Sequence, residues 1–81
     1  MMTYEKKLYD LHIKFMEEYD NYSKTAIEIA KKMATGIPVT VDDHKKREAL
    51  FNSFTEAFSQ HKRLQQHVIE NKIDVKKNLE I

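Results

Sequence analysis

The sequence contains no cysteine and no tryptophan, and it has only one glycine and one proline in 81 residues. Without cysteine the chain can form neither a disulfide framework nor a Cys₂His₂ or Cys₄ zinc site, which excludes the small disulfide-stabilised secreted scaffolds. The scarcity of glycine and proline argues against an all-β fold, whose many turns need these residues. A chain of this length forms one domain at most and buries only about 60% of its unfolded surface, so it often needs self-association for stability.

Charge of neither sign dominates, because 14 Lys and Arg residues stand against 13 Asp and Glu residues, for a net charge of +1. This balance disfavours an extended basic surface for nucleic acid and equally an acidic disordered tail. No apolar run approaches the ~20 residues of a membrane span, and the start, MMTYEKKLYDLH, lacks the apolar core of a signal peptide. We therefore expect a cytoplasmic protein with no membrane partner.

The single glycine and the single proline lie together near the middle of the chain. Gly36 is placed to take the left-handed position that ends many helices, and Pro38 prevents a helix from continuing. Thr40 followed by Asp43 is typical of an N-cap with a capping box, which starts a new helix. This punctuation predicts two helices joined by a short loop.

Apolar residues on both sides of this break recur at intervals of three and four, which is the spacing of one helical face. The pattern predicts an all-α antiparallel hairpin, a single domain over 1–81, with helices over about 3–34 and 41–70, a loop over 35–40 and a tail over 71–81. The expected seam comprises Tyr4, Leu8, Leu11, Phe15, Tyr19, Tyr22, Ala26, Ile29 and Met33 from the first helix, and Leu50, Phe54, Ala57, His61, Leu64 and Val68 from the second.

Both expected helices also carry a second apolar row, which includes Ile13, Met16, Phe51 and Phe58. A two-helix hairpin covers only one stripe of each helix, so something else must cover these residues. Exposed apolar surface of this extent usually marks an interface, and a symmetric homo-oligomer is the commonest arrangement for a small chain. We therefore expect the hairpins to assemble into a symmetric homo-oligomeric bundle.

The tail after the second expected helix leaves two alternatives open. Asp74 can cap a last short turn. In the other alternative, four apolar residues dock as an extended arm: Ile73, Val75, Leu79 and Ile81.

The sequence contains few residues in arrangements that are typical of catalytic sites. The chain has no cysteine nucleophile, no glycine-rich phosphate loop and no serine elbow. No two of the four histidines, which are His12, His44, His61 and His67, are separated by the four positions of a helical metal motif. We expect neither an enzyme nor a metal or other cofactor, with His61 in the seam and the other three histidines solvated.

Basic residues gather around the expected loop, although the whole chain is nearly neutral. Lys31 and Lys32 end the first helix, and Lys45, Lys46 and Arg47 open the second. A helix N-terminus adds free N–H groups and a positive dipole, so this tip is a candidate site for a phosphate-bearing ligand. The alternative is that these side chains form an ordinary solvated surface.

A second candidate site lies on the first helix, where Tyr9 stands beside the main stripe and Lys24 follows fifteen positions later. The segments KLYDLH and NYSKTA, this spacing and the Phe-rich helix after a glycine-containing turn resemble the phage anti-CBASS cyclic-nucleotide sponges, whose hairpin domain is shared with anti-Thoeris sponges. The resemblance implies a hexamer in the cytoplasm of an infected bacterium. It implies that the protein sequesters cyclic dinucleotides and trinucleotides without cleaving them, which blocks CBASS-type immunity. It also implies that Tyr9 and Lys24 contact the cyclic dinucleotide.

Helix geometry shows what such a site requires. Tyr9 and Lys24 are separated by about 22 Å along one helix and by about 60° around it, so one small ligand cannot touch both within one chain. Two first helices that cross antiparallel near Met16 and Glu17 place Tyr9 of one copy beside Lys24 of the other. A cyclic dinucleotide has the matching two-fold symmetry, with two bases to stack and two phosphates to pair.

A function of another class is also compatible with the sequence. The chain can instead be a small helical adaptor or inhibitor. It would then bind a host protein through the exposed face that carries Phe51 and Phe58.

Overall fold

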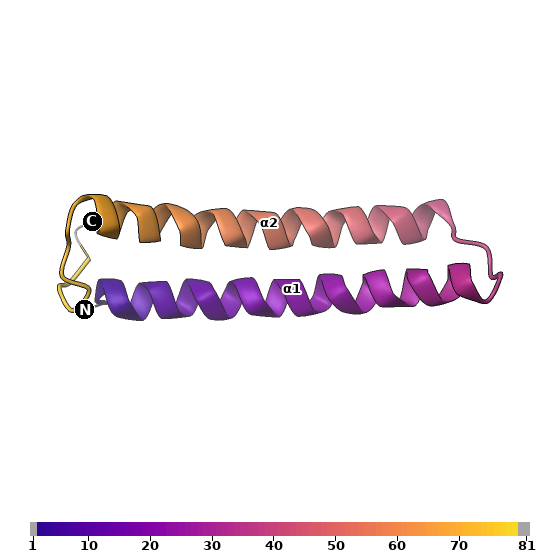
Figure 1. Ribbon diagram of the computed structural model, residues 1–81, viewed down its shortest axis with the longest axis horizontal. Coiled ribbons are helices and arrows are strands. Elements are labelled where there is room, and N and C mark those ends of the chain that lie inside the picture. The colour runs from indigo at the N-terminus through magenta and orange to yellow at the C-terminus, as the bar shows by residue number, and fades with distance from the viewer. Residues whose placement is uncertain (1, 80–81) are drawn as a thin grey trace.

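The computed structural model describes residues 2–79, which form two long helices lying side by side and running in opposite directions (Figure 1). Helix α1 spans Tyr4–Ala34 and helix α2 spans Val41–Glu70. The hairpin is a rod of 54 × 18 × 14 Å, with the loop at one end and the start of α1 beside the tail at the other. Both helices lie within one residue of the ranges expected from the sequence, and the all-α hairpin is confirmed.

The end of α1 has the geometry predicted from its glycine. Gly36 has a φ of 76°, in the left-handed region that strains any residue with a Cβ. The Gly36 N–H donates to the Met33 carbonyl at 3.4 Å, and the Ile37 N–H donates to the Lys32 carbonyl at 2.9 Å. This pair of bonds is the Schellman motif, which satisfies carbonyls that the helix itself leaves without a donor.

Helix α2 is capped at both ends. At its start, the Asp43 N–H donates to the Thr40 hydroxyl at 3.1 Å and the Thr40 N–H donates to the Asp43 carboxylate at 3.0 Å, so the predicted capping box is confirmed. At its end, Lys72 takes the left-handed conformation with a φ of 51°, and the Ile73 N–H donates to the Val68 carbonyl at 3.0 Å. A second Schellman motif therefore ends α2 without a glycine.

The tail combines the two alternatives left open by the sequence. The Lys77 N–H donates to the Asp74 carbonyl at 2.9 Å, which forms a turn directly after α2. The chain then reaches the start of α1, where the Val75 carbonyl accepts from the Glu5 N–H at 2.7 Å and the Lys77 carbonyl accepts from the Tyr4 N–H at 3.1 Å. The tail thus supplies acceptors for two of the N–H groups that begin α1.

Two further contacts complete this end of the hairpin. The Thr3 hydroxyl caps α1 by accepting from the Lys6 N–H at 3.1 Å. The Leu79 N–H donates to the Met2 carbonyl at 2.9 Å, next to an isolated antiparallel bridge between Thr3 and Asn78. Ile81, which belongs to the arm in one of the two alternatives, lies outside the described residues.

The interior of residues 2–79 is small, because most seam side chains keep some contact with solvent. The buried residues are Tyr4, Thr25, Ile29, Ala57 and Val68. Tyr19 and Met33 were expected in the seam, but they are 46% and 69% exposed. Tyr19 lies about 80° around α1 from Ile29, at the edge of the stripe. Met33 lies near the polar first turn of α2.

Neither α1 nor α2 contains a stretch apolar enough to cross a membrane.

The phenylalanines of the second row behave differently from its aliphatic residues. The Phe58 ring centroid lies 5.2 Å from that of Phe15, and that of Phe51 lies 5.5 Å from that of Tyr22. Each of these two phenylalanines remains 45% exposed, so their expected exposure is confirmed. The ring contacts cover part of each side chain, because the aromatic rings reach across the flank of the hairpin. Ile13 remains 39% exposed.

Candidate ligand-binding site

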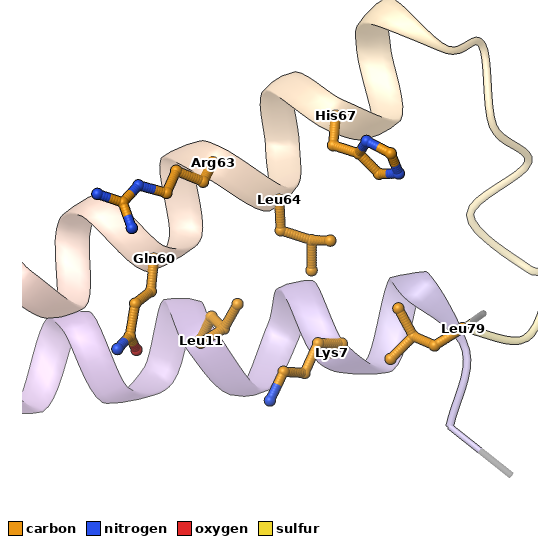
Figure 2. Close-up of a pocket in the computed structure, with 7 residues that line it drawn as sticks. All are labelled: Lys7, Leu11, Gln60, Arg63, Leu64, His67 and Leu79. Carbon is orange, nitrogen blue, oxygen red and sulfur yellow. The ribbon is translucent and has the colours of Figure 1, made fainter. Parts of the chain in front are cut away.

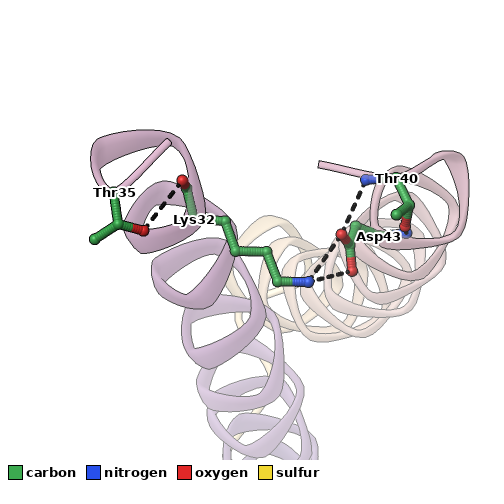
Figure 3. Close-up of polar contacts among 4 residues, drawn as sticks. All are labelled: Lys32, Thr35, Thr40 and Asp43. Atoms are coloured by element: carbon green, nitrogen blue, oxygen red, sulfur yellow. Dashed lines mark hydrogen bonds and ion pairs between the residues drawn. The ribbon is translucent and has the colours of Figure 1, made fainter. Parts of the chain in front are cut away.

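The hairpin tip is held by an ion pair between the two helices. Lys32 Nζ lies 3.0 Å and 2.9 Å from the two carboxylate oxygens of Asp43, which also accepts from the Thr40 N–H (Figure 3). The Thr40 backbone hydrogen bond is the largest cause that lowers the pKa of Asp43 to about 2, and the bond from Lys32 is the next. The start of α2 therefore already holds a carboxylate, and Lys32 is engaged with it.

The three basic residues that open α2 at the predicted tip site do not converge. Lys45, Lys46 and Arg47 are all exposed, and consecutive residues of a helix point about 100° apart. Of these three, Arg47 lines a groove of about 550 Å³ on one flank of the hairpin. Lys45 and Lys46 do not line it. Their predicted role in holding a phosphate stays a prediction, and the geometry offers no common position for all three.

The groove beside Arg47 is lined by residues of both helices. Its other lining residues are Tyr22 from α1 and His44, Glu48 and Phe51 from α2. The rings of Tyr22 and Phe51, 5.5 Å apart and inclined at 54°, form an aromatic wall next to the guanidinium-bearing side chain. Aromatic faces and cations are the groups that bind bases and phosphates. Sequence reasoning placed Tyr22 in the seam and missed this groove.

The groove could have been predicted from the register of the two helices, that is, from which positions of α1 and α2 lie opposite one another. Aromatic contacts join position 12 with 61, 15 with 58, 19 with 54 and 22 with 51. As one number rises by three or four, the other falls by as much, so a single register aligns this stretch of the two helices. Fixing that register from the loop over 35–40 places positions 22 and 51 opposite one another.

Tyr9 and Lys24 lie far apart on the same helix, as helix geometry requires. Tyr9 is 59% exposed, and Lys6 Nζ lies 5.4 Å from the centroid of its ring. The Lys24 side chain is 71% exposed, and its Nζ lies 2.9 Å from an Asp20 carboxylate oxygen. A surface ion pair of this kind contributes little and exchanges readily with a stronger anion. Both side chains are therefore accessible to a ligand.

Apolar side chains surround Tyr9 on the face of α1 that points away from α2. Ile13, Met16 and Ile27 are 39%, 47% and 52% exposed. With Tyr9 they fall within an arc of about 60° around the helix, and Lys24 lies at its edge. We call these five residues the outer face of α1. Its four apolar and aromatic members are all exposed in the single hairpin.

The histidines lie closer together than the sequence suggested. The ring of His12 on α1 lies 5.6 Å from that of His61 on α2 and 6.1 Å from that of Phe15. His61 packs in the seam and the other three histidines are exposed, as expected, although the shared register brings the ring of His12 opposite that of His61. Within residues 2–79, no cluster of three His, Cys, Asp or Glu side chains is arranged to hold a metal ion.

Comparisons with known proteins do not assign the chain to a family. No protein-family model, curated protein or solved structure matches it.

Proposed function

We propose that the chain self-associates through the outer face of α1 and that the assembly sequesters cyclic oligonucleotides without cleaving them. The ligands are cyclic dinucleotides and also cyclic trinucleotides, and the assembly is an even-numbered homo-oligomer, a hexamer if the resemblance holds. The observation that carries this proposal is that Tyr9 and Lys24, both accessible, share one face of α1 with Ile13 and Met16. A stacking group, a cation and an apolar contact surface are thus presented together.

The apolar residues supply the reason for two chains to meet. A hairpin with so small an interior gains stability when Ile13, Met16 and Ile27 are removed from water, at roughly 25 cal/mol per Å² of apolar surface. A two-fold axis near Met16 makes the two α1 helices cross antiparallel. Tyr9 of one chain then lies beside Lys24 of its partner, and the symmetry produces this pair twice.

Each pair can hold one cyclic dinucleotide, because the two pairs lie about 22 Å apart and one small ligand cannot reach both. Stacking of a base on the Tyr9 ring is worth about 1–3 kcal/mol. A bond from the Lys24 ammonium to a phosphate is charge-assisted and is worth about 1.5–3 kcal/mol. To make it, Lys24 exchanges Asp20 for the phosphate, and one such exchange occurs for each ligand. Binding of this kind positions the ligand and activates no water or nucleophile, so the ligand stays intact.

Native mass spectrometry of the full chain, with and without a panel of cyclic di- and trinucleotides, tests the proposal directly. We expect an even-numbered oligomer with two intact cyclic dinucleotides for each pair of chains. Tyr9→Ala and Lys24→Ala should each weaken binding by about tenfold, because each variant loses one contact worth about 1–3 kcal/mol. Tyr9→Phe, which keeps the stacking face, and Lys14→Ala, which removes an exposed lysine elsewhere on α1, should bind as the parent does.

Three results would contradict the proposal. They are a folded monomer that binds none of the nucleotides, recovery of a linearised product, and full affinity in both alanine variants. The first of these would favour the adaptor or inhibitor that docks a host protein through Phe51 and Phe58, each of which is 45% exposed along the flank of the hairpin.

A further inference from the structure

A second groove lies on the opposite flank of the hairpin from Arg47, near the end where the tail docks. It has a volume of about 580 Å³ and is lined by Lys7, Leu11, Gln60, Arg63, Leu64, His67 and Leu79 (Figure 2). This volume is in the range of small-molecule sites, which extend over about 300–1,000 Å³. Three structural elements meet here, because α1, α2 and the tail each contribute a leucine.

The apolar part of this groove is purely aliphatic. Leu11 and Leu64 are partly buried between the helices, and Leu79 lies at the tail end (Figure 2). The position of Leu79 follows from the backbone bond of its N–H to the Met2 carbonyl, at 2.9 Å. His67 stands at the same end, with its ring centroid 6.5 Å from that of Tyr4. The docked tail therefore closes one end of the aliphatic surface.

The polar part of the groove carries the positive charges of Lys7 and Arg63. Both side chains extend toward the end occupied by Gln60 (Figure 2). Among the described residues no carboxylate lines the groove, and the nearest one that is bonded to its lining is Glu56, which accepts from Gln60 Nε2 at 3.3 Å. The ion pairs within residues 2–79 join Lys6 with Asp10, Lys24 with Asp20 and Lys32 with Asp43, so they involve neither Lys7 nor Arg63. Gln60 lies at the end of the groove toward which the two cations extend, and the leucines lie nearer the tail (Figure 2).

We propose that this groove binds the anion of a medium-chain fatty acid. Lys7 and Arg63 bind the carboxylate, and the Gln60 amide exchanges its bond to Glu56 for one to the ligand. The alkyl chain lies over Leu11 and Leu64 toward Leu79. Charge complementarity selects the ligand: two unpaired cations exclude a cation and favour a single anionic head, and the aliphatic surface favours an alkyl chain over an aromatic ring. This site is independent of the outer face of α1.

Decanoate, kept below its critical micelle concentration, is the probe. Titration into the full chain, labelled on its leucine methyl groups, should shift the signals of Leu11, Leu64 and Leu79 in a saturable way. Binding should weaken by about tenfold, or 1.4 kcal/mol, in a double variant that carries Lys7→Gln and Arg63→Gln. Decanol, which has the chain without the charge, should bind correspondingly weakly.

The matched control carries Lys14→Gln and Lys62→Gln, two exposed lysines outside the groove, so it changes the net charge by the same amount. It should bind decanoate as the parent chain does. Equal weakening in the two double variants would mean that net charge alone attracts the probe, and it would overturn the proposal. Absence of saturable shifts at these three leucines, or decanol binding as tightly as decanoate, would also overturn it.

Discussion

Phe15 is the residue whose removal should damage the hairpin most. Its ring lies 5.2 Å from that of Phe58, 5.3 Å from that of Phe54 and 6.1 Å from that of His12, so it joins α1 to two successive turns of α2. Truncation by Phe15→Ala removes all three contacts near the middle of the rod. Few other side chains can compensate, because so little of the hairpin is buried.

The size of the loss follows from the burial of Phe15. A Phe→Ala change in a closed core costs about 3–5 kcal/mol, and the cavity that it leaves is part of this cost. Phe15 is only partly buried and its site is open to water, so we expect about 2–3 kcal/mol. In a domain of this size each kcal/mol lowers the melting temperature by about 4–8 °C, which predicts a decrease of about 10–20 °C.

Thermal unfolding followed by far-UV circular dichroism, at several protein concentrations, measures this effect. Phe15→Leu keeps an apolar side chain but removes the aromatic pairs, each worth about 0.5–1.5 kcal/mol, so its loss should be intermediate. Ile27→Ala changes a residue that is 52% exposed in the single hairpin. Its cost at the lowest concentration should stay within about 0.5 kcal/mol and should grow with concentration if the outer face of α1 mediates assembly.

A loss in Phe15→Ala no greater than that in Ile27→Ala at low concentration would refute this reasoning. It would show that the ring contacts across the hairpin do not hold the two helices together. Stability would then have to come from contacts between chains.

The ends of the helices give two further predictions. Because the pKa of Asp43 in the folded protein is lowered to about 2 from 3.8, its stabilising contribution is complete above about pH 4 and is lost as the pH falls toward 2. In Asp43→Asn, the urea midpoint should therefore depend less on pH over this interval, and an unchanged dependence would assign it to other carboxylates. Gly36→Ala should cost about 1–2 kcal/mol by urea unfolding through backbone strain alone, because no atom lies within 4 Å of the added Cβ. Lys72→Gly relieves the same strain at a φ of 51° and should stabilise the chain by up to about 1 kcal/mol, so destabilisation would contradict this account.

Local signals in the sequence were sufficient for most of the fold. Gly36, Pro38 and the pair of Thr40 and Asp43 determine where one helix ends and the next begins, because each acts through its own backbone or nearest neighbours. The spacing of apolar residues identified most of the seam, because residues three and four apart along the chain lie on one face of a helix. The cap at Lys72 had no such signal, since lysine adopts the left-handed region only where the surrounding structure compensates for the strain.

The features that the sequence did not reveal depend on contacts between distant parts of the chain. Whether Phe51 packs against Tyr22 depends on the register of the two helices and on how far a ring reaches over the flank. The position of Arg47 beside the rings of Tyr22 and Phe51 depends on the same register. The site proposed for Tyr9 and Lys24 depends on a second chain, so a single hairpin can present its parts without completing it.

The docking of the tail also has a consequence for the order of folding during synthesis. The N–H groups of Tyr4 and Glu5 find their acceptors in Lys77 and Val75, so residues made first are completed by residues made last. While the ribosome is still adding α2, the first turn of α1 lacks these acceptors and should fray. Amide hydrogen exchange at Tyr4 and Glu5 should therefore report closure of the whole chain, whereas the middle of α1 reports only pairing of the helices.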